Sequence, residues 1–289
     1  MRPFPNITAA TGVLEVRKLK TRIIAAVSLL PFLLAIVLFL PKICTAILFG
    51  LMAAIGAYEL LHNTGLVKQN RLVWYAIIMA LYVSLWGSTV TAYPAILLGA
   101  LAFFAILFGE LLKNHDQLRF EDLAYTFVAG IILPYLLSAV VRIHSQETGR
   151  HLILLPFVVA FLSDTGAYFA GRFFGKHKMA PVISPKKTVE GLVGGVVTAI
   201  VGVVIYCLIL KGAFDFQVNW IYVPVYGILG SLGAVFGDLC FSVIKRHTGI
   251  KDYGNLIPGH GGIFDRFDSM VVVAPLVELL LLTIPLVVK

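Results

Sequence analysis

The sequence predicts an all-α integral membrane protein with about nine transmembrane helices, its N-terminus in the cytoplasm and its C-terminus outside. Two observations lead to this prediction. The 289 residues are 59% hydrophobic and 13% charged, whereas soluble domains carry about twice that share of charge. The apolar residues also form long runs without the alternation of a membrane β-barrel, so the backbone must satisfy its hydrogen bonds as helices.

Nine apolar runs approach the length of about 20 residues that a helix needs to cross a bilayer. In chain order they cover 23–40, 43–61, 72–88, 94–112, 123–141, 152–171, 191–210, 221–244 and 269–287. Pro31 lies in the first run and the third run is short, so we expect kinked or tilted helices there.

The distribution of Lys and Arg predicts the orientation. With the N-terminus inside, 18 of the 23 Lys and Arg residues fall in cytoplasmic segments, which is the positive-inside bias. The bias places the loops 172–190 and 245–268 in the cytoplasm. The net charge of +8 is then mainly a topology signal. We expect no nucleic-acid partner, although cations beside a bilayer attract anionic lipid head groups.

Ionisable groups are rare in most of the apolar runs. Glu59 and Glu110 lie near predicted helix ends and Glu278 lies inside the last helix, which makes each a functional candidate by default. We favour the simpler interpretation, a carboxylate that snorkels or bonds a neighbouring helix, because none lies near another chemical cluster. The three cysteines form no CxxC pair and indicate neither a disulfide framework nor a zinc site.

Polar residues concentrate in the C-terminal half. Asp164 interrupts the sixth helix one turn from Tyr168, and we favour a functional site slightly over a packing face. In the stretch SPKKTVEG, Lys186 and Lys187 precede Thr188, which can cap the next helix. Lysines and free amides at a helix start suit an anion, although taken alone these lysines are ordinary cytoplasmic charges.

A second cluster lies near the end of the eighth helix, where Asp238, Ser242 and Lys245 share one helical face. In the stretch GHGGIFDRFDS that follows, Asp265 can meet Asp238 across a short loop. Carboxylate and hydroxyl oxygens are what Mg²⁺ prefers, so the two aspartates are candidate metal ligands; a solvated charged loop explains them equally well. The glycines of this stretch would let the backbone approach a phosphate closely: Gly259, Gly261 and Gly262.

These residue types imply phosphoryl or nucleotidyl transfer. Carboxylates hold a metal, the metal holds phosphate oxygens, and Lys and Arg neutralise the remaining charge. The sequence has no GxxxxGK[ST], GxGxxG or HExxH motif and no evident Ser-His-Asp set. His260 is open to three roles, as a general base, a phosphate donor or a structural hydrogen-bonding group.

The stretch SVIKRHTGIKDYGNLIPGHGGIFDRFD, residues 242–268, resembles throughout the signature of the phosphatidate cytidylyltransferases, also called CDP-diacylglycerol synthases. Every fixed position of that signature is present. SDTGAYFAGRFFGKHK and SPKKTVEGLVGG also resemble family segments, in the same order. The N-terminal half resembles the family only in being a set of spanning helices. One position departs, because many relatives carry Glu immediately before the serine and this chain has Phe241.

The resemblance implies an enzyme that makes CDP-diacylglycerol and pyrophosphate from CTP and phosphatidate with Mg²⁺, in a membrane homodimer; a second cation is left open. It implies catalytic roles for Asp238 and Asp265 as metal ligands, for Ser242 beside them, and for Lys187 reaching the phosphates. It also implies a substrate pocket lined by Lys245, Arg246, Lys251, His260 and Arg266. From the residues themselves we add to the substrate-binding set Lys186, Asp164, Gly261 and Gly262.

We accordingly divide the chain into a cytoplasmic tail (1–22), scaffold helices with dimer contacts (23–150) and a catalytic region (151–289). Topology and the resemblance imply a bacterial inner membrane with the active site facing the cytoplasm. Two alternatives stay open. One is another CTP-dependent lipid-phosphate enzyme such as a lipid kinase; the other, less favoured, is a transporter, for which the sequence shows no convincing internal repeat.

Overall fold

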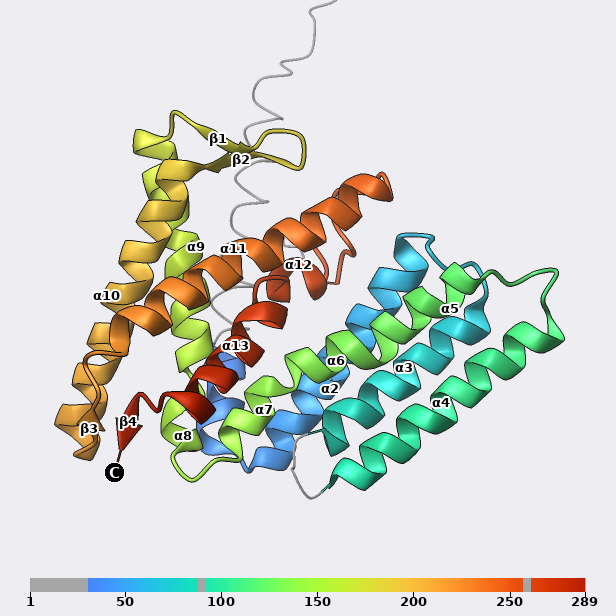
Figure 1. Cartoon of the computed structure of the whole chain (residues 1–289), viewed down its shortest axis with the longest axis horizontal. Coiled ribbons are helices and arrows are strands. Elements are labelled where there is room, and N and C mark those ends of the chain that lie inside the picture. Colours follow the sequence, from blue (N-terminus) through green and yellow to red (C-terminus); the bar gives the residue numbers. More distant parts are fainter. Residues whose placement is uncertain (1–30, 88–91, 257–260, 289) are drawn as a thin grey trace, which may run out of the picture.

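The computed structural model describes residues 31–87, 92–256 and 261–288, and these residues are mostly helical (Figure 1). Six helices in the described ranges are long and apolar enough to cross a membrane. They are Lys42–Asn63, Tyr93–Lys113, Phe120–His144, Gly149–Phe174, Val189–Phe214 and Val223–His247. The helical membrane class is confirmed, while the count of nine and the placement of the termini stay predictions.

The labelled helices are α2 (Lys42–Tyr58), α3 (Asn70–Trp86), α4 (Tyr93–Lys113), α5 (Phe120–Phe127), α6 (Leu133–Leu137), α7 (Ala139–His144), α8 (Gly149–Leu152), α9 (Leu155–Phe174), α10 (Val189–Phe214), α11 (Val223–His247), α12 (Phe264–Phe267) and α13 (Met270–Thr283). Two π-helical turns, η1 (Glu59–Asn63) and η3 (Val128–Ile132), continue α2 and α5. The strands are β1 (Lys178–Ala180), β2 (Ser184–Thr188), β3 (Gln217–Val218) and β4 (Val287–Val288).

Most predicted spans agree with these helices to within a few residues, but the last one is shorter than predicted. The sequence predicts a helix to 287, whereas α13 ends at Thr283. Pro285 has no N–H to donate and so cannot continue the helix, and β4 instead pairs antiparallel with β3. Residues 31–39 are helical; the rest of the predicted first span and the tail lie outside the described residues.

A β-hairpin that the sequence did not predict follows α9. Its strands β1 and β2 pair antiparallel, and Pro185 lies within β2. Successive side chains of a strand point to opposite faces, so Lys186 is exposed while Lys187 is partly buried. The predicted cap is confirmed, because Thr188 Oγ1 accepts the Gly191 N–H at 3.1 Å at the start of α10.

The helices form two groups that α13 connects (Figure 1). On one side α9 packs along α10 and against α11; on the other, α2, α3 and α5–α7 pack together, with α4 at the edge. Between them α13 contacts α9 and α11 as well as α6 and α7. Gly166 faces the Thr198 side chain and the Gly194 carbonyl with no room for a Cβ, so this glycine lets α9 and α10 approach closely.

A largely buried ion pair connects α13 to the N-terminal helices. Arg142 Nε and Nη2 donate to the two Glu278 carboxylate oxygens at 2.7 and 2.8 Å, and the side chains are 15% and 13% exposed. Glu110 likewise bonds a neighbouring helix, through Arg71 at 2.9 Å. The interpretation of these two glutamates as interhelix-bonded carboxylates is confirmed.

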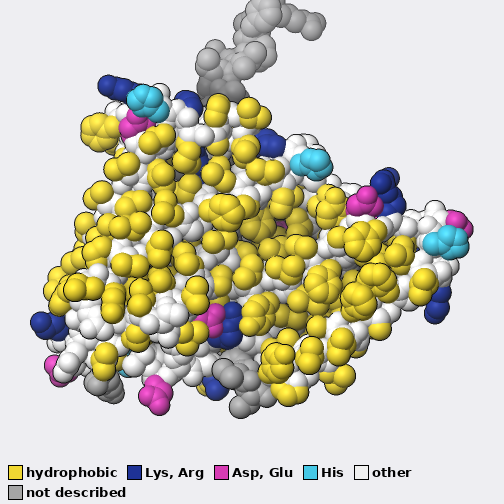
Figure 2. Space-filling model, in the orientation of Figure 1, with side chains coloured by type: hydrophobic (Ala, Val, Ile, Leu, Met, Phe, Trp, Pro, Cys, Tyr) yellow, Lys and Arg dark blue, Asp and Glu magenta, His cyan; other side chains and the backbone are white. Residues whose placement is uncertain are grey.

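Apolar side chains cover most of the face seen in Figure 2, and charged ones lie mainly toward its upper and lower edges. The hairpin and the C-terminal end of α11 lie toward one end of the helices, and β3 and β4 lie toward the other (Figure 1). Arg246 Nε donates to the Ile183 carbonyl at 3.2 Å, so the end of α11 contacts the hairpin. The described parts of the two loops predicted to be cytoplasmic therefore meet.

Candidate active site

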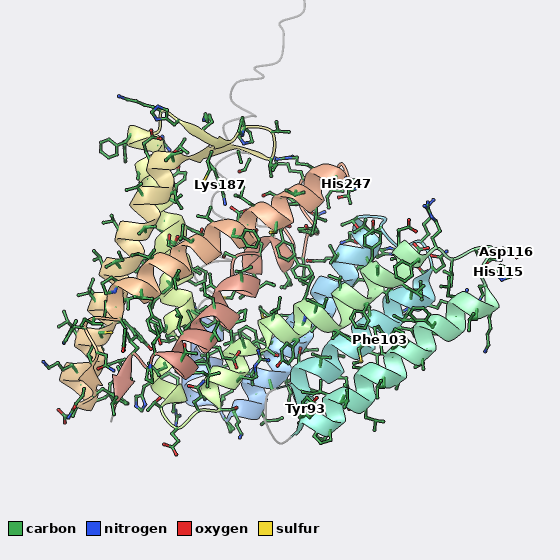
Figure 3. The ribbon with its side chains drawn as sticks, viewed as in Figure 1. Tyr93, Phe103, His115, Asp116, Lys187 and His247 are labelled. Carbon is green, nitrogen blue, oxygen red and sulfur yellow. The ribbon has the colours of Figure 1, made fainter. Side chains whose placement is uncertain are left out.

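Lys187 of β2 and Asp238 of α11 form the first ion pair of the site. Lys187 Nζ lies 2.5 Å from Asp238 Oδ2 and 3.4 Å from the Val235 carbonyl oxygen. One turn further along α11, Ser242 Oγ donates to Asp238 Oδ1 at 3.2 Å. The predicted polar face of this helix is therefore formed, and Figure 3 shows Lys187 between the hairpin and α11.

The Asp265 carboxylate is bound by three donors and its side chain is only 2% exposed. Lys245 Nζ lies 3.0 Å from Oδ1, while the Tyr253 and Gly262 N–H groups donate to Oδ2 at 2.7 and 3.0 Å. Charge-assisted bonds of this kind are stronger than neutral ones. Lys245 thus connects the polar face of α11 to Asp265 in α12.

Further charges surround Asp238. Asp164 of α9 experiences the charges of Asp238, Lys187 and Arg266, so the residues predicted from three separate segments are brought together. Asp268, which follows α12, is also close to Asp238. Burial, reinforced by the negative charge of Asp238, raises the pKa of Asp268 to about 7. Asp268 therefore carries a proton part of the time near neutral pH.

The other predicted substrate-binding cations are exposed: Lys186, Arg246, Lys251 and Arg266. Of these, Arg246 contacts the hairpin and Arg266 lies close enough to Asp164 for their charges to interact. His260 lies outside the described residues, together with Gly259, so its role stays open.

Two glycines of the signature, Gly261 and Gly262, make room for carboxylates. Gly261 has a φ of +88°, which a residue with a side chain rarely adopts. A Cβ there would lie 2.8 Å from Asp265 Oδ2. A Cβ at Gly262 would lie 2.5 Å from both carboxylate oxygens of Glu59. Their approach to a phosphate stays a prediction.

Glu59 is the site residue that the sequence analysis missed. It is 2% exposed, and its Oε1 and Oε2 accept the N–H groups of Ile263 and Phe264 at 3.0 and 3.1 Å. We expected a snorkelling or interhelix-bonded carboxylate, and Glu59 instead binds the signature stretch. The sequence signal was an ionisable residue in an apolar helix, but 204 residues separate Glu59 from Ile263.

Phe241 occupies the one position at which the chain departs from the expected signature. Its ring stacks on Phe264 with 5.1 Å between ring centroids, and its carbonyl oxygen accepts the Tyr253 hydroxyl at 2.9 Å. Burial raises the pKa of Tyr253, so the phenol stays a hydrogen-bond donor. In this chain the position contributes to the core beneath α12 rather than a charge to the site.

Known proteins are similar to this chain over most of its length. Residues 20–284 match the model of the cytidylyltransferase family. The chain belongs to the cytidylyltransferase family. Glu59, Lys187, Asp238 and Asp265 of this cytidylyltransferase all lie inside the matched region.

Relatives cover nearly the whole length of this cytidylyltransferase. A phosphatidate cytidylyltransferase of Staphylococcus haemolyticus is 35% identical over 266 residues, which are 86% of this chain and 96% of the relative. That of Staphylococcus saprophyticus is 36% identical over 87% of this chain and 97% of its own. That of Staphylococcus aureus is 36% identical over 93% of this chain and 99% of its own. The family membership and the enzyme class, a nucleotidyltransferase, are thereby established.

The oxygen donors of the site fit Mg²⁺. Asp238 and Ser242 offer a carboxylate and a hydroxyl on one face, with Asp164 and Asp268 close to Asp238. Among the described residues no group of three or more His, Cys, Asp or Glu could enclose an ion. Mg²⁺ is usually held by one or two carboxylates together with water and substrate phosphates. The donor set therefore suits an ion shared with a phosphate substrate.

Proposed function

We propose that this cytidylyltransferase transfers CMP from CTP to phosphatidate, giving CDP-diacylglycerol and pyrophosphate, at the cytoplasmic face of a bacterial inner membrane. The observation that carries the proposal is the presence of two ion pairs along α11, Lys187 with Asp238 and Lys245 with Asp265. The names of the Staphylococcus relatives support the same substrates.

The charges of the site suit this chemistry. A phosphate oxygen of phosphatidate attacks the α-phosphorus of CTP; one P–O bond forms, and the bond to the β-phosphate breaks as pyrophosphate leaves. The attacking oxygen is already anionic near neutral pH, so no strong general base is needed. The obstacle is repulsion between two anions, and Lys187, Lys245 and Arg266 offset it by electrostatic stabilisation.

We propose Asp238 and Asp265 as ligands of a Mg²⁺ ion, with Ser242 beside them and a second cation left open. When bound, the ion would neutralise phosphate charge and orient phosphate oxygens. The Asp238 side chain is 31% exposed and so is accessible to a ligand, whereas Asp265 is held in place by Lys245 and two backbone amides.

The N-terminal helices are proposed as a scaffold that also forms a homodimer. Support comes from α4, in which the buried residues are Phe103 and Leu107 only. Many of its other apolar side chains are exposed, among them Leu97, Leu98, Leu101, Phe104 and Ile106, and lipid or a second copy would cover them.

A product assay tests the function. Purified protein with CTP, Mg²⁺ and phosphatidate should release pyrophosphate and leave CMP on the lipid. Release of CDP with a phosphorylated lipid product would instead identify a lipid kinase. Flux through proteoliposomes in the absence of nucleotide would identify a transporter, and a failure of every nucleotide to support turnover would overturn the proposal.

A further inference from the structure

The π-helical turn η1 at the end of α2 contacts the signature stretch at two separate points. Its first residue, Glu59, binds the backbone at Ile263 and Phe264, and its last residue, Asn63, donates from Nδ2 to the Tyr253 carbonyl at 2.8 Å. π-Helical turns are rare and occur frequently at functional sites. Here the turn presents an acceptor and a donor to one loop.

The Glu59 contact determines where α12 begins. Each carboxylate oxygen accepts one of two consecutive N–H groups, at the N-cap residue Ile263 and at Phe264, the first residue of the helix. Asp265 and Arg266 follow directly in this short helix. Because Ile263 has no side-chain cap of its own, Glu59 satisfies amides that would otherwise lack partners in a buried place.

The Asn63 contact reaches Asp265 through Tyr253. The Tyr253 carbonyl accepts from Asn63, and the Tyr253 N–H donates to Asp265 Oδ2 at 2.7 Å. The same Asp265 oxygen accepts the Gly262 N–H at 3.0 Å. Glu59 and Asn63 therefore hold the two segments of backbone whose amides hold Asp265.

The fit around Glu59 is close. A Cβ at Gly254 would lie 2.6 Å from Glu59 Oε1, and one at Gly262 would lie 2.5 Å from both oxygens. On the α2 side of the contact, a Cβ at Gly56 would lie 2.7 Å from the Phe264 ring. Three glycines thus allow α2 and the signature stretch to meet with the carboxylate enclosed between them.

We infer that Glu59, assisted by Asn63, is a positioning residue for the transfer reaction, one that holds α12 so that Asp265 and Arg266 face the substrate phosphates. The inference rests on the proposed function. It gives the N-terminal half a part in the reaction, through its hold on α12, beyond that of a scaffold. The alternative is that Glu59 merely stabilises the fold.

The variant Glu59→Gln separates these roles. The amide keeps the size of the side chain but puts an NH₂ donor against a backbone N–H, so one of the two hydrogen bonds is lost. We expect kcat for pyrophosphate release to fall at least about tenfold while KM for CTP changes less than about threefold, the pattern of a lost transition-state interaction. Glu110→Gln is the matched control, because Glu110 bonds Arg71 and Tyr75 of α3, and its kcat should stay within about twofold of wild type.

Hydrogen–deuterium exchange gives a readout that does not depend on activity. Peptides covering 261–268 should exchange faster in Glu59→Gln than in wild type or Glu110→Gln. Should Glu59→Gln fail to fold, Asn63→Ala decides, with an expected fall in kcat of about threefold and faster exchange in the same peptides.

Two results would count against the inference. Either variant with a lowered melting temperature but unchanged kcat and unchanged exchange over 261–268 would show a purely structural role. A wild-type protein that makes no CDP-diacylglycerol would refute the proposed function instead. An active wild type beside an equally active Glu59→Gln overturns only the positioning role.

Discussion

At the scale of single residues, two adjacent lysines have different surroundings. Lys187 points from β2 to Asp238, whereas Lys186 points from the opposite face and is exposed. Neighbouring side chains of a strand point to opposite faces, which contributes to this difference. The ion pair with Asp238 favours Lys187 over Lys186 as the lysine on which the proposed reaction depends.

Lys187→Gln should lower kcat/KM at least about 30-fold, or about 2 kcal/mol of transition-state stabilisation. The reason is that the substrate phosphates lose a cation and Asp238 loses its partner. Lys186→Gln is the matched control and should stay within about threefold. Pyrophosphate release measured over a range of CTP concentrations gives both values, and equal effects of the two variants would refute the assignment.

Asp265 has two roles, because it pairs with Lys245 and is also a proposed metal ligand. Asp265→Asn should reduce turnover at least about 100-fold, about 2.7 kcal/mol.

Asp238→Asn should raise the Mg²⁺ concentration needed for half-maximal rate. Asp215→Asn serves as control, since Asp215 has a φ of 55° that Asn tolerates and lies at the C-terminal end of α10. Full activity of Asp265→Asn would disprove the metal assignment.

At the scale of elements, the two groups of helices are held together by α13, and its contact with α7 contains the Arg142–Glu278 pair. Arg142 Nη1 also donates to Ser138 Oγ and to the Tyr135 carbonyl. Removing one partner of a buried pair leaves an uncompensated charge, which costs more than removing both.

Glu278→Leu should therefore lower the free energy of unfolding by about 3 kcal/mol, and the double variant Arg142→Leu/Glu278→Leu should recover part of that loss. Thermal unfolding in detergent measures both. Glu121→Gln, which breaks the exposed contact with Arg119, should change stability little. A double variant less stable than Glu278→Leu would contradict this account of the pair.

At the scale of the whole molecule, the charged loops meet at one end and the short β3–β4 sheet lies toward the other (Figure 1). Because 18 of 23 cations fall on the side predicted to be cytoplasmic, the positive-inside rule predicts that the hairpin faces the cytoplasm.

Thiol labelling tests this orientation. In a background with Cys44, Cys207 and Cys240 replaced by Ala, a membrane-impermeant reagent applied to intact cells should label Lys211→Cys but not Lys178→Cys. In inverted vesicles the reagent should label Lys178→Cys but not Lys211→Cys. Labelling of Lys178→Cys in intact cells would place the hairpin, and the site beside it, on the outer side.

The sequence by itself determined the class of the protein, the positions of most helices and the residues proposed for the candidate site. Long apolar runs leave the backbone no choice but helix in lipid, and the i, i+4 spacing of Asp238 and Ser242 settles that they share a face. The contiguous signature of residues 242–268 was enough to predict the family. Each of these properties depends on neighbours in the chain, so local patterns suffice to predict it.

Only the tertiary structure decided which of these residues are partners. In the folded hairpin Lys187, and not Lys186, pairs with Asp238. Asp265 binds Lys245 and two backbone amides, and Phe241 packs in the core. Above all, Glu59 packs against the start of α12, and a side chain at Gly262 would clash with the Glu59 carboxylate. Helix packing between segments 204 residues apart produces this contact, and no pattern along the chain encodes it.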